Sequence, residues 1–364
     1  MELQTIAFKV RGLSFFLASW IALMITGCTG GYLHPSLAKT SFPVESRTIV
    51  SSTLNLTEIW RFRTGAPNSF VSNIQTPPFI FITKDKVIFG SYVDLSKSSA
   101  SYLTALSPSS GKIIWQTLYN DPGYGTNLNS AYLDTKTNSL FLVYSFRVAR
   151  FDLETGQQLW ITPNLGDHTN YIFAYEQIDH LILDSSEREQ ITINPSNGQV
   201  LSRQKTGQPR MTIIREGIKL VNNPGFTAMD QNNQTIWTWH QAGLDVEFWP
   251  FFINKNDLIA QFGGPVYYLA RINYHTGEKV WESVFYIMSN YALHENRVFA
   301  LIDDGALVAL DLENGKVVGL MKFDKKIRNG DVATRPFWVA VSHPYLFTYF
   351  GDTQELVAFK FDTK

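Results

Sequence analysis

The sequence predicts an all-β fold, a seven-bladed β-propeller with four antiparallel strands per blade that is closed by an N-terminal strand completing the last blade. Three observations predict it. Short apolar runs follow one another along most of the chain, a glycine turn recurs at a nearly constant period, and an incomplete repeat stands at each end of the series.

Seven apolar hairpins open the repeats. Each joins two runs of roughly four to eight residues, rich in Val, Ile, Phe and Tyr, through a short polar turn, as in PFIFITKDKVIFGSYV. Such runs are typical of strands, and none shows the 3.6-residue stripe of a long amphipathic helix. The hairpins begin near Pro77, Ala131, Tyr171, Thr212, Phe251, Tyr291 and Phe337.

A second hairpin follows each of the first six, as in VARFDLETGQQLW and LVALDLENGKVVGL. Its tight turn needs a residue at positive φ, which glycine adopts freely and asparagine tolerates next best. The first and last of these turns lie 204 residues and five repeats apart. The period of about 41 residues is typical of a four-stranded propeller blade. The turn residues are Gly111, Gly156, Gly198, Asn233, Gly277 and Gly315.

The seventh repeat is incomplete, because LVAFKFDTK stops at Lys364, where the turn glycine would stand. The segment LTEIWRFRTG, from Leu56 to Gly65, precedes the first hairpin and has the form of the missing closing strand. We therefore expect this segment to pair with residues 356–361, so that no edge of the last blade is left open.

Tryptophan recurs on the closing strands, the last strand of each repeat. One interpretation is packing between neighbouring blades, and the alternative is an aromatic ladder that binds sugars. The regular spacing favours packing. The residues are Trp60, Trp115, Trp160, Trp237 and Trp281.

The N-terminus has the features of a bacterial lipoprotein precursor. Lys9 and Arg11 precede a 13-residue, largely apolar run, LSFFLASWIALMI, which is shorter than the roughly 20 residues of a membrane-spanning helix. The following ITGC resembles the lipobox, whose cysteine accepts a diacylglyceryl group. The resemblance implies a signal peptide over 1–27 and lipid attachment at Cys28, the only cysteine. The alternative is an unpaired cysteine in an ordinary signal-anchor helix.

Composition and charge complete the domain organisation. Residues 28–54 are rich in Ser and Thr and predict a flexible tether, and 55–364 form the predicted propeller domain. The chain carries 31 Lys and Arg against 32 Asp and Glu. This balance disfavours binding to nucleic acid. With one cysteine, the fold is expected to hold without a disulfide.

The repeats ALDLENGKVVG, RFDLETGQQLW and ALSPSSGKIIW resemble the PQQ-like β-propeller repeat. The resemblance covers nearly the whole chain after the tether. That family includes quinoprotein dehydrogenases, which bind pyrroloquinoline quinone and calcium, and non-enzymatic BamB-like lipoprotein scaffolds. Lipobox, tether and repeat together resemble the scaffold branch, although BamB has eight blades and seven are counted here. The resemblance implies a membrane-anchored, non-catalytic interaction scaffold.

The dehydrogenase branch needs residues that this sequence does not supply. The resemblance implies, for that branch, a larger eight-bladed propeller with a vicinal cysteine pair and with carboxylates that hold calcium. Here Asp303 and Asp304 precede Gly305 and predict a hairpin turn rather than a calcium site. The histidines are scattered, at His34, His168, His180, His240, His275, His294 and His343. We expect no catalytic residue, no cofactor and no metal.

The expected partner is an unidentified envelope protein, bound by a monomeric propeller that a lipid anchors to the plasma or outer membrane. The alternative is an extracytoplasmic receptor for a small molecule or glycan at the mouth of the central channel. A third, less favoured function is a quinoprotein dehydrogenase. The segment VEFWPFFIN offers one candidate surface, since exposed aromatics at Phe248 and Trp249 would suit a partner or glycan. We favour the simpler interpretation, in which Phe251 begins a buried strand.

Overall fold

The computed structural model describes most of the chain after residue 45. All described residues belong to one compact unit, Ser36–Lys364. They form strands and turns, and no helix within them is long and apolar enough to cross a membrane. The described ranges are 46–63, 80–94, 99–118, 128–144, 147–166, 172–177, 180–184, 189–205, 212–215, 217–222, 226–239, 251–263, 267–325 and 337–362.

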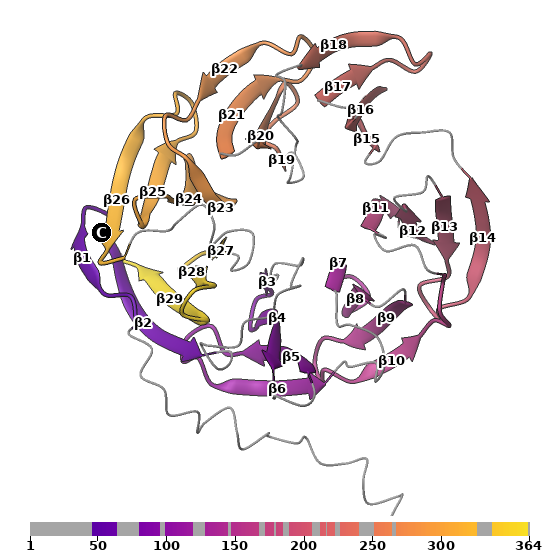
Figure 1. The fold of residues 1–364 in the computed structure, drawn as a ribbon, viewed down its shortest axis with the longest axis horizontal. Helices are drawn as coiled ribbons and strands as arrows, with labels where there is room; N and C mark the ends of the chain where they lie inside the picture. The colour runs from indigo at the N-terminus through magenta and orange to yellow at the C-terminus, as the bar shows by residue number, and fades with distance from the viewer. Residues whose placement is uncertain are drawn as a thin grey trace, which may run out of the picture. The chain divides into compact units, whose positions relative to one another are not determined.

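Five sheets hold four antiparallel strands each, and they follow one another in chain order (Figure 1). The first is β3 (Ile80–Ile82), β4 (Val87–Asp94), β5 (Ser99–Leu106) and β6 (Ile113–Leu118). The second is β7 (Leu128–Asp134), β8 (Ser139–Tyr144), β9 (Arg147–Asp152) and β10 (Gln158–Ile161). The third is β11 (Ile172–Gln177), β12 (His180–Asp184), β13 (Glu189–Ile193) and β14 (Val200–Lys205).

The next two sheets repeat this arrangement. One is β15 (Thr212–Arg215), β16 (Ile218–Asn222), β17 (Phe226–Met229) and β18 (Thr235–Trp239). The other is β19 (Phe251–Phe252), β20 (Asp257–Gly263), β21 (Tyr267–Asn273) and β22 (Lys279–Glu282). In every one of these five sheets the predicted turn residue lies between the third and fourth strands and has φ between 63° and 74°.

The remaining strands form one nine-stranded sheet in the order β1-β26-β25-β24-β23-β27-β28-β29-β2. Its halves are joined by a single parallel pair, Ser289 on β23 with Phe337 on β27. The sheet therefore contains two antiparallel four-stranded units and the additional strand β1. Its strands are β1 (Ile49–Ser52), β2 (Leu56–Arg63), β23 (Ile287–His294), β24 (Arg297–Ile302), β25 (Ala306–Asp311), β26 (Val317–Phe323), β27 (Phe337–Ser342), β28 (Tyr345–Phe350) and β29 (Glu355–Phe361).

Strand β2 completes the unit that ends the chain. It pairs antiparallel with β29 over its whole length, from Leu56 opposite Phe361 to Arg63 opposite Glu355 (Figure 1). This is the pairing that the incomplete last repeat predicts. The two strands are separated by almost the whole described chain, so their pairing ties its N-terminal part to its C-terminal part.

The predicted tether over 28–54 is wrong at its C-terminal end. Residues 49–52 form β1, which pairs with β26 through Ile49 opposite Phe323 and Ser52 opposite Met321. Leu54 is buried, with 9% of its surface exposed. Residues 28–45, including Cys28, lie outside the described residues.

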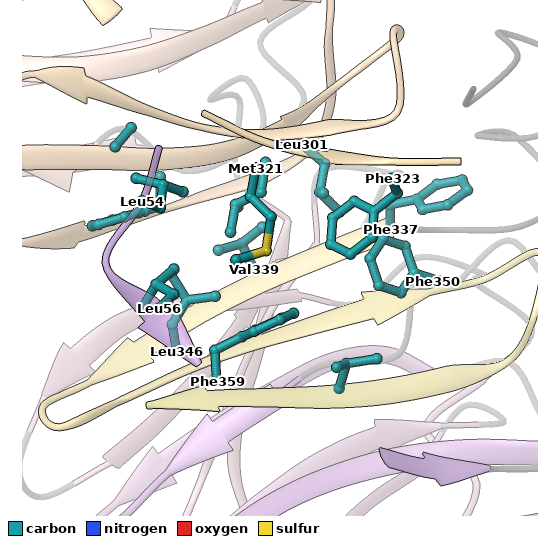
Figure 2. Close-up of a cluster of buried hydrophobic side chains, with 14 of the residues drawn as sticks. Leu54, Leu56, Leu301, Met321, Phe323, Phe337, Val339, Leu346, Phe350 and Phe359 are labelled. Carbon is teal, nitrogen blue, oxygen red and sulfur yellow. The ribbon is translucent and has the colours of Figure 1, made fainter. Parts of the chain in front are cut away.

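Buried apolar clusters join units that are neighbours in chain order, because each sheet carries apolar side chains on both faces. Five such clusters link successive units. A sixth contains Phe89 of β4 together with Phe347 of β28, and so links the first four-stranded unit to the last. The cluster between the β23–β26 and β27–β29 units includes Leu54 and Leu56, and is drawn in Figure 2. Among the described side chains, no cluster of this kind joins β11–β14 to β15–β18.

Candidate functional site

Catalytic chemistry was not predicted, and no group of three or more His, Cys, Asp or Glu side chains within the described ranges could hold a metal ion. Asp304 lies in the β24–β25 turn, as predicted, with Gly305 at φ 81°. Its carboxylate lies 3.2 Å from the Lys322 ammonium. Cys28, the one predicted modification site, stays a prediction.

The repeated tryptophans connect neighbouring units. Each indole N–H donates to a main-chain carbonyl beside the turn of the following unit, so the ring lies over that turn. The acceptors are Pro108 for Trp60 (2.8 Å), Leu153 for Trp115 (3.0 Å), Pro195 for Trp160 (3.1 Å), Tyr274 for Trp237 (2.9 Å) and Leu312 for Trp281 (2.9 Å). The predicted packing role is confirmed.

The turn glycine makes this contact possible. A Cβ added to Gly156 would lie 2.4 Å from the ring of Trp115, closer than side-chain atoms approach one another. The corresponding distances at Gly111, Gly198, Gly277 and Gly315 are 2.7–2.8 Å from the facing tryptophan. The glycine therefore has two functions, since it adopts positive φ and it leaves room for an indole.

An arginine strengthens two of these junctions. Arg271 donates to the Leu312 carbonyl that Trp281 also uses, and its guanidinium lies 2.6 Å from Asp257 and 2.7 Å from Glu313. Burial alone would lower the pKa of Arg271, but the hydrogen bonds to these carboxylates raise it above its ordinary value. Arg150 reaches the Pro195 carbonyl in the same way, at 3.3 Å.

Two closing strands lack the tryptophan. Four residues after the turn residue, β14 has Ser202 and β26 has Gly319. At Gly319 the chain supplies a substitute, because an added Cβ would lie 2.2 Å from Leu54 Cδ2. The Leu54 side chain thus covers the place where an indole would begin.

Leu54 ends a segment that we call the N-terminal arm, residues 46–54. Its Arg47 is fully buried and its guanidinium lies 2.7 Å from the Asp352 carboxylate. The same side chain donates to the Lys325 carbonyl and lies over the rings of Phe337 and Phe350, 5.7 Å and 5.2 Å from their centroids. The arm therefore contacts both halves of the nine-stranded sheet.

A second polar contact holds the arm. Asp324 accepts hydrogen bonds from the Thr48 main-chain N–H, at 3.0 Å, and from its hydroxyl, at 2.9 Å. Burial alone would raise the pKa of Asp324, but these hydrogen bonds hold it below its usual value. Sequence reasoning missed Arg47, Leu54 and Thr48 because nothing in a Ser- and Thr-rich segment without apolar periodicity indicates a docked strand.

The closing strands also carry most of the exposed large apolar side chains of the described residues. Three residues after the turn residue, every one of six closing strands has a branched aliphatic residue that is 44–51% exposed. The residues are Ile114, Leu159, Leu201, Ile236, Val280 and Val318. Single exposed apolar residues are common on protein surfaces. These six, however, recur at one position of the repeat, so each closing strand presents the same kind of side chain at the same place.

Two histidines that looked isolated in the sequence lie together. The rings of His294 and His343 stack with centroids 5.3 Å apart, and Phe361 lies 4.9 Å from His294. Burial lowers the pKa of His294, and the neighbouring His343 and Arg297 lower it further against the opposing charge of Glu295. Their 49-residue separation gave no sequence signal for this pair.

The aromatic segment 246–254 is described only from residue 251, where Phe251 and Phe252 form β19. The expectation that Phe251 begins a strand is confirmed. Phe248 and Trp249 lie outside the described residues.

Comparison with known proteins identifies the fold. No family model matches the chain, and no curated protein matches its sequence. Among solved structures it is similar to BamB from Moraxella catarrhalis, with a TM-score of 0.53 and 12% identity, over 84% of this chain and 100% of that chain. At this identity the similarity concerns the fold alone. The described residues form an all-β, β-propeller-like fold that resembles BamB.

Proposed function

We propose that this chain is a lipid-anchored, seven-bladed β-propeller that acts as a non-catalytic scaffold for an envelope protein. The blade count is supported by five separate four-stranded sheets and by two four-stranded units within the nine-stranded sheet. Closure is supported by the β2–β29 pairing and by the apolar cluster shared between the first and last units. The anchor is supported by the lipobox at Cys28.

The observation that carries the scaffold function is the repetition of exposed aliphatic side chains on the closing strands. Five of these six strands, β6, β10, β14, β18 and β22, are edge strands among the described sheets, and β26 is covered by β1. On the five edge strands, main-chain groups and an exposed apolar side chain are available together. Such an edge suits binding to another polypeptide. A monomeric propeller that binds a partner along one such edge can hold it beside the membrane that carries its lipid.

The test is cross-linked affinity capture of the tagged full-length protein from its own membrane, with Cys28→Ala as the unanchored control. We expect one envelope protein to be recovered in stoichiometric amount with the wild type and to be lost with the control. The membrane fraction should also lose the Cys28→Ala protein. Recovery of no envelope protein would contradict the scaffold function.

One observation favours the alternative of a receptor for a small polar molecule. The side chain of Gln261 on β20 is 1% exposed, and neither its oxygen nor its nitrogen has a hydrogen-bond partner in the structure. A buried amide without partners costs free energy, which a polar ligand could offset. Thermal-shift screening of glycans and quinones against wild type and Gln261→Leu tests this function, since a true ligand would raise the Tm of the wild type only.

A further inference from the structure

Strand β14 differs from the other closing strands of the described sheets. All six of its residues are exposed. At the position where β6, β10, β18 and β22 place a tryptophan, it has Ser202. The place over the next turn that an indole covers elsewhere is therefore not covered by a side chain of β14.

The facing turn matches this difference. Of the six turn residues, the five glycines face a tryptophan, and Asn233, which follows Ser202 in blade order, does not. Asn233 keeps the positive φ, at 63°, but its side chain is exposed and accepts a hydrogen bond from Lys219 at 2.8 Å. Strand and turn therefore carry exposed polar side chains at this junction, where five other junctions have an indole over a glycine.

The chain itself shows how such a closing strand can be completed. Strand β26 also lacks the tryptophan, and there β1 adds as a fifth, antiparallel strand. Thr53 N–H donates to the Leu320 carbonyl at 2.7 Å, and the Leu54 side chain covers Gly319. Ser202 and Arg203 are the residues of β14 that correspond to Gly319 and Leu320.

We propose that the free edge of β14 binds an extended segment of a partner polypeptide, which adds as a fifth strand and places an aliphatic side chain over Ser202. The segment runs antiparallel to β14 and bonds the main chain of Arg203, as the arm does on β26. This proposal rests on the scaffold function and names its binding surface.

The charge of β14 specifies the partner further. Arg203 and Lys205 are both exposed on this strand, and Glu189 on β13 lies 3.5 Å from the Arg203 guanidinium, which also donates to the Leu165 carbonyl. Two cations beside one carboxylate leave this edge with a net positive charge, which repels a basic strand and favours an acidic one. The partner segment is therefore extended and acidic, and it contains the branched aliphatic residue that lies over Ser202.

The experiment places a photo-cross-linking amino acid at Leu201 in the full-length protein in its own membrane. Leu201 is 45% exposed and lies on the edge strand. Val280 on β22 and Ile114 on β6 occupy the same repeat position on strands that keep their tryptophan, so they are matched controls. Mass spectrometry maps the cross-linked peptide.

A variant that blocks the proposed site can be designed from the tryptophan–glycine contact of the other junctions. Ser202→Trp combined with Asn233→Gly recreates the tryptophan over a glycine turn, and Asn233→Gly alone is its control. The reversal Arg203→Glu with Lys205→Glu is a second variant that leaves Ser202 in place. Unchanged Tm values establish that each variant is folded.

We expect a cross-link from position 201 to an acidic, extended segment of one envelope protein, and little from positions 114 and 280. The adduct should fall about tenfold in the blocking variant and in the charge reversal, but not in Asn233→Gly alone. Equal adducts from all three positions, an adduct unaffected by the blocking variant, or an adduct within this chain or a second copy would overturn the proposal.

Failure of this proposal is distinguishable from failure of the scaffold function. If affinity capture recovers an envelope protein while position 201 gives no adduct with it, the scaffold function stands and the β14 site is wrong. If neither method finds a protein partner, both are wrong.

Discussion

At the scale of single residues, the contact between an indole and a glycine turn recurs at five junctions between units. Trp115, Trp237 and Trp281 are 7–9% exposed, and the indole N–H of each donates a hydrogen bond to a main-chain carbonyl of the next unit. A buried indole N–H without a partner would be costly, so the ring fixes the distance between units as well as filling space.

The glycine in this contact gives a first prediction. Gly156→Ala should destabilise the protein by about 2–4 kcal/mol, because alanine is strained at φ 70° and its Cβ meets Trp115. Asn233→Ala is the control, since it keeps the strain at positive φ without an indole, and should cost about 1 kcal/mol. Urea unfolding measures both. Equal losses would show that the indole contact contributes nothing.

At the scale of elements, the N-terminal arm covers the closing strand β26, which lacks the tryptophan of the repeat. Strand β1 extends one four-stranded unit, and β2, which follows it directly, completes the next. The buried Arg47 sits where the arm enters this arrangement and neutralises Asp352. The two strands and the arginine therefore hold together the two units whose shared apolar cluster is drawn in Figure 2.

The contacts of the N-terminal arm predict that Arg47 stabilises the fold. Arg47→Ala should lower the free energy of unfolding by about 2–4 kcal/mol, because it removes the buried guanidinium that pairs with the Asp352 carboxylate and donates to the Lys325 carbonyl, and it removes contacts with two phenyl rings. Thr48→Ala removes an exposed hydrogen bond nearby and should cost less than about 1 kcal/mol. Similar urea midpoints for Arg47→Ala and wild type would mean that the arm does not stabilise the fold.

The stacked histidines predict a pH effect at the same junction. The folded-state pKa of His294 lies below its ordinary value near 6.5, so the folded protein binds the proton less readily than the unfolded chain. Stability is therefore complete above about pH 7 and falls as the pH drops through 6.5 towards the folded-state pKa. Comparing urea midpoints at about pH 7.5 and 5.5, the decrease should be smaller for His294→Phe, which keeps the ring stack. An equal decrease in both proteins would assign the effect to other groups.

Local patterns made part of this structure predictable. The alternation of apolar residues and the need for positive φ in a tight turn act over a few residues, so the strands and Gly111 to Gly315 could be located without tertiary information. The incomplete last repeat likewise predicted the partner of β2. Arg47 and Leu54 could not be found, because their contacts lie about 270–300 residues away and their segment resembles a linker. That Ser202 stands where an indole would face the Asn233 turn could be recognised only once the structure placed each tryptophan over the turn of the following unit.

At the scale of the whole molecule, the stability of the fold depends on joining its two ends. Each unit shares an apolar cluster with a neighbour, and two main-chain pairings, β1 with β26 and β2 with β29, connect the N-terminal and C-terminal parts of the described chain; of these, β2–β29 completes a four-stranded unit. Loss of this pairing would expose two strand edges and the cluster that contains Phe89 and Phe347.

This closure predicts the effect of a disulfide across β2 and β29. Thr57 and Lys360 face each other in the ladder and are both exposed, so cysteines at these positions are within bonding distance without disturbing the core. In a Cys28→Ser background the oxidised Thr57→Cys/Lys360→Cys protein should be more stable than its reduced form by about 4–5 kcal/mol, because the loop spans nearly the whole fold. A pair at Gln190 and Gln204, opposite each other in β13 and β14, is the local control and should add about 3 kcal/mol. Urea unfolding with and without reductant measures both. If the local pair oxidises and the β2–β29 pair does not, the two strands are not paired in solution and the propeller is not closed in this way.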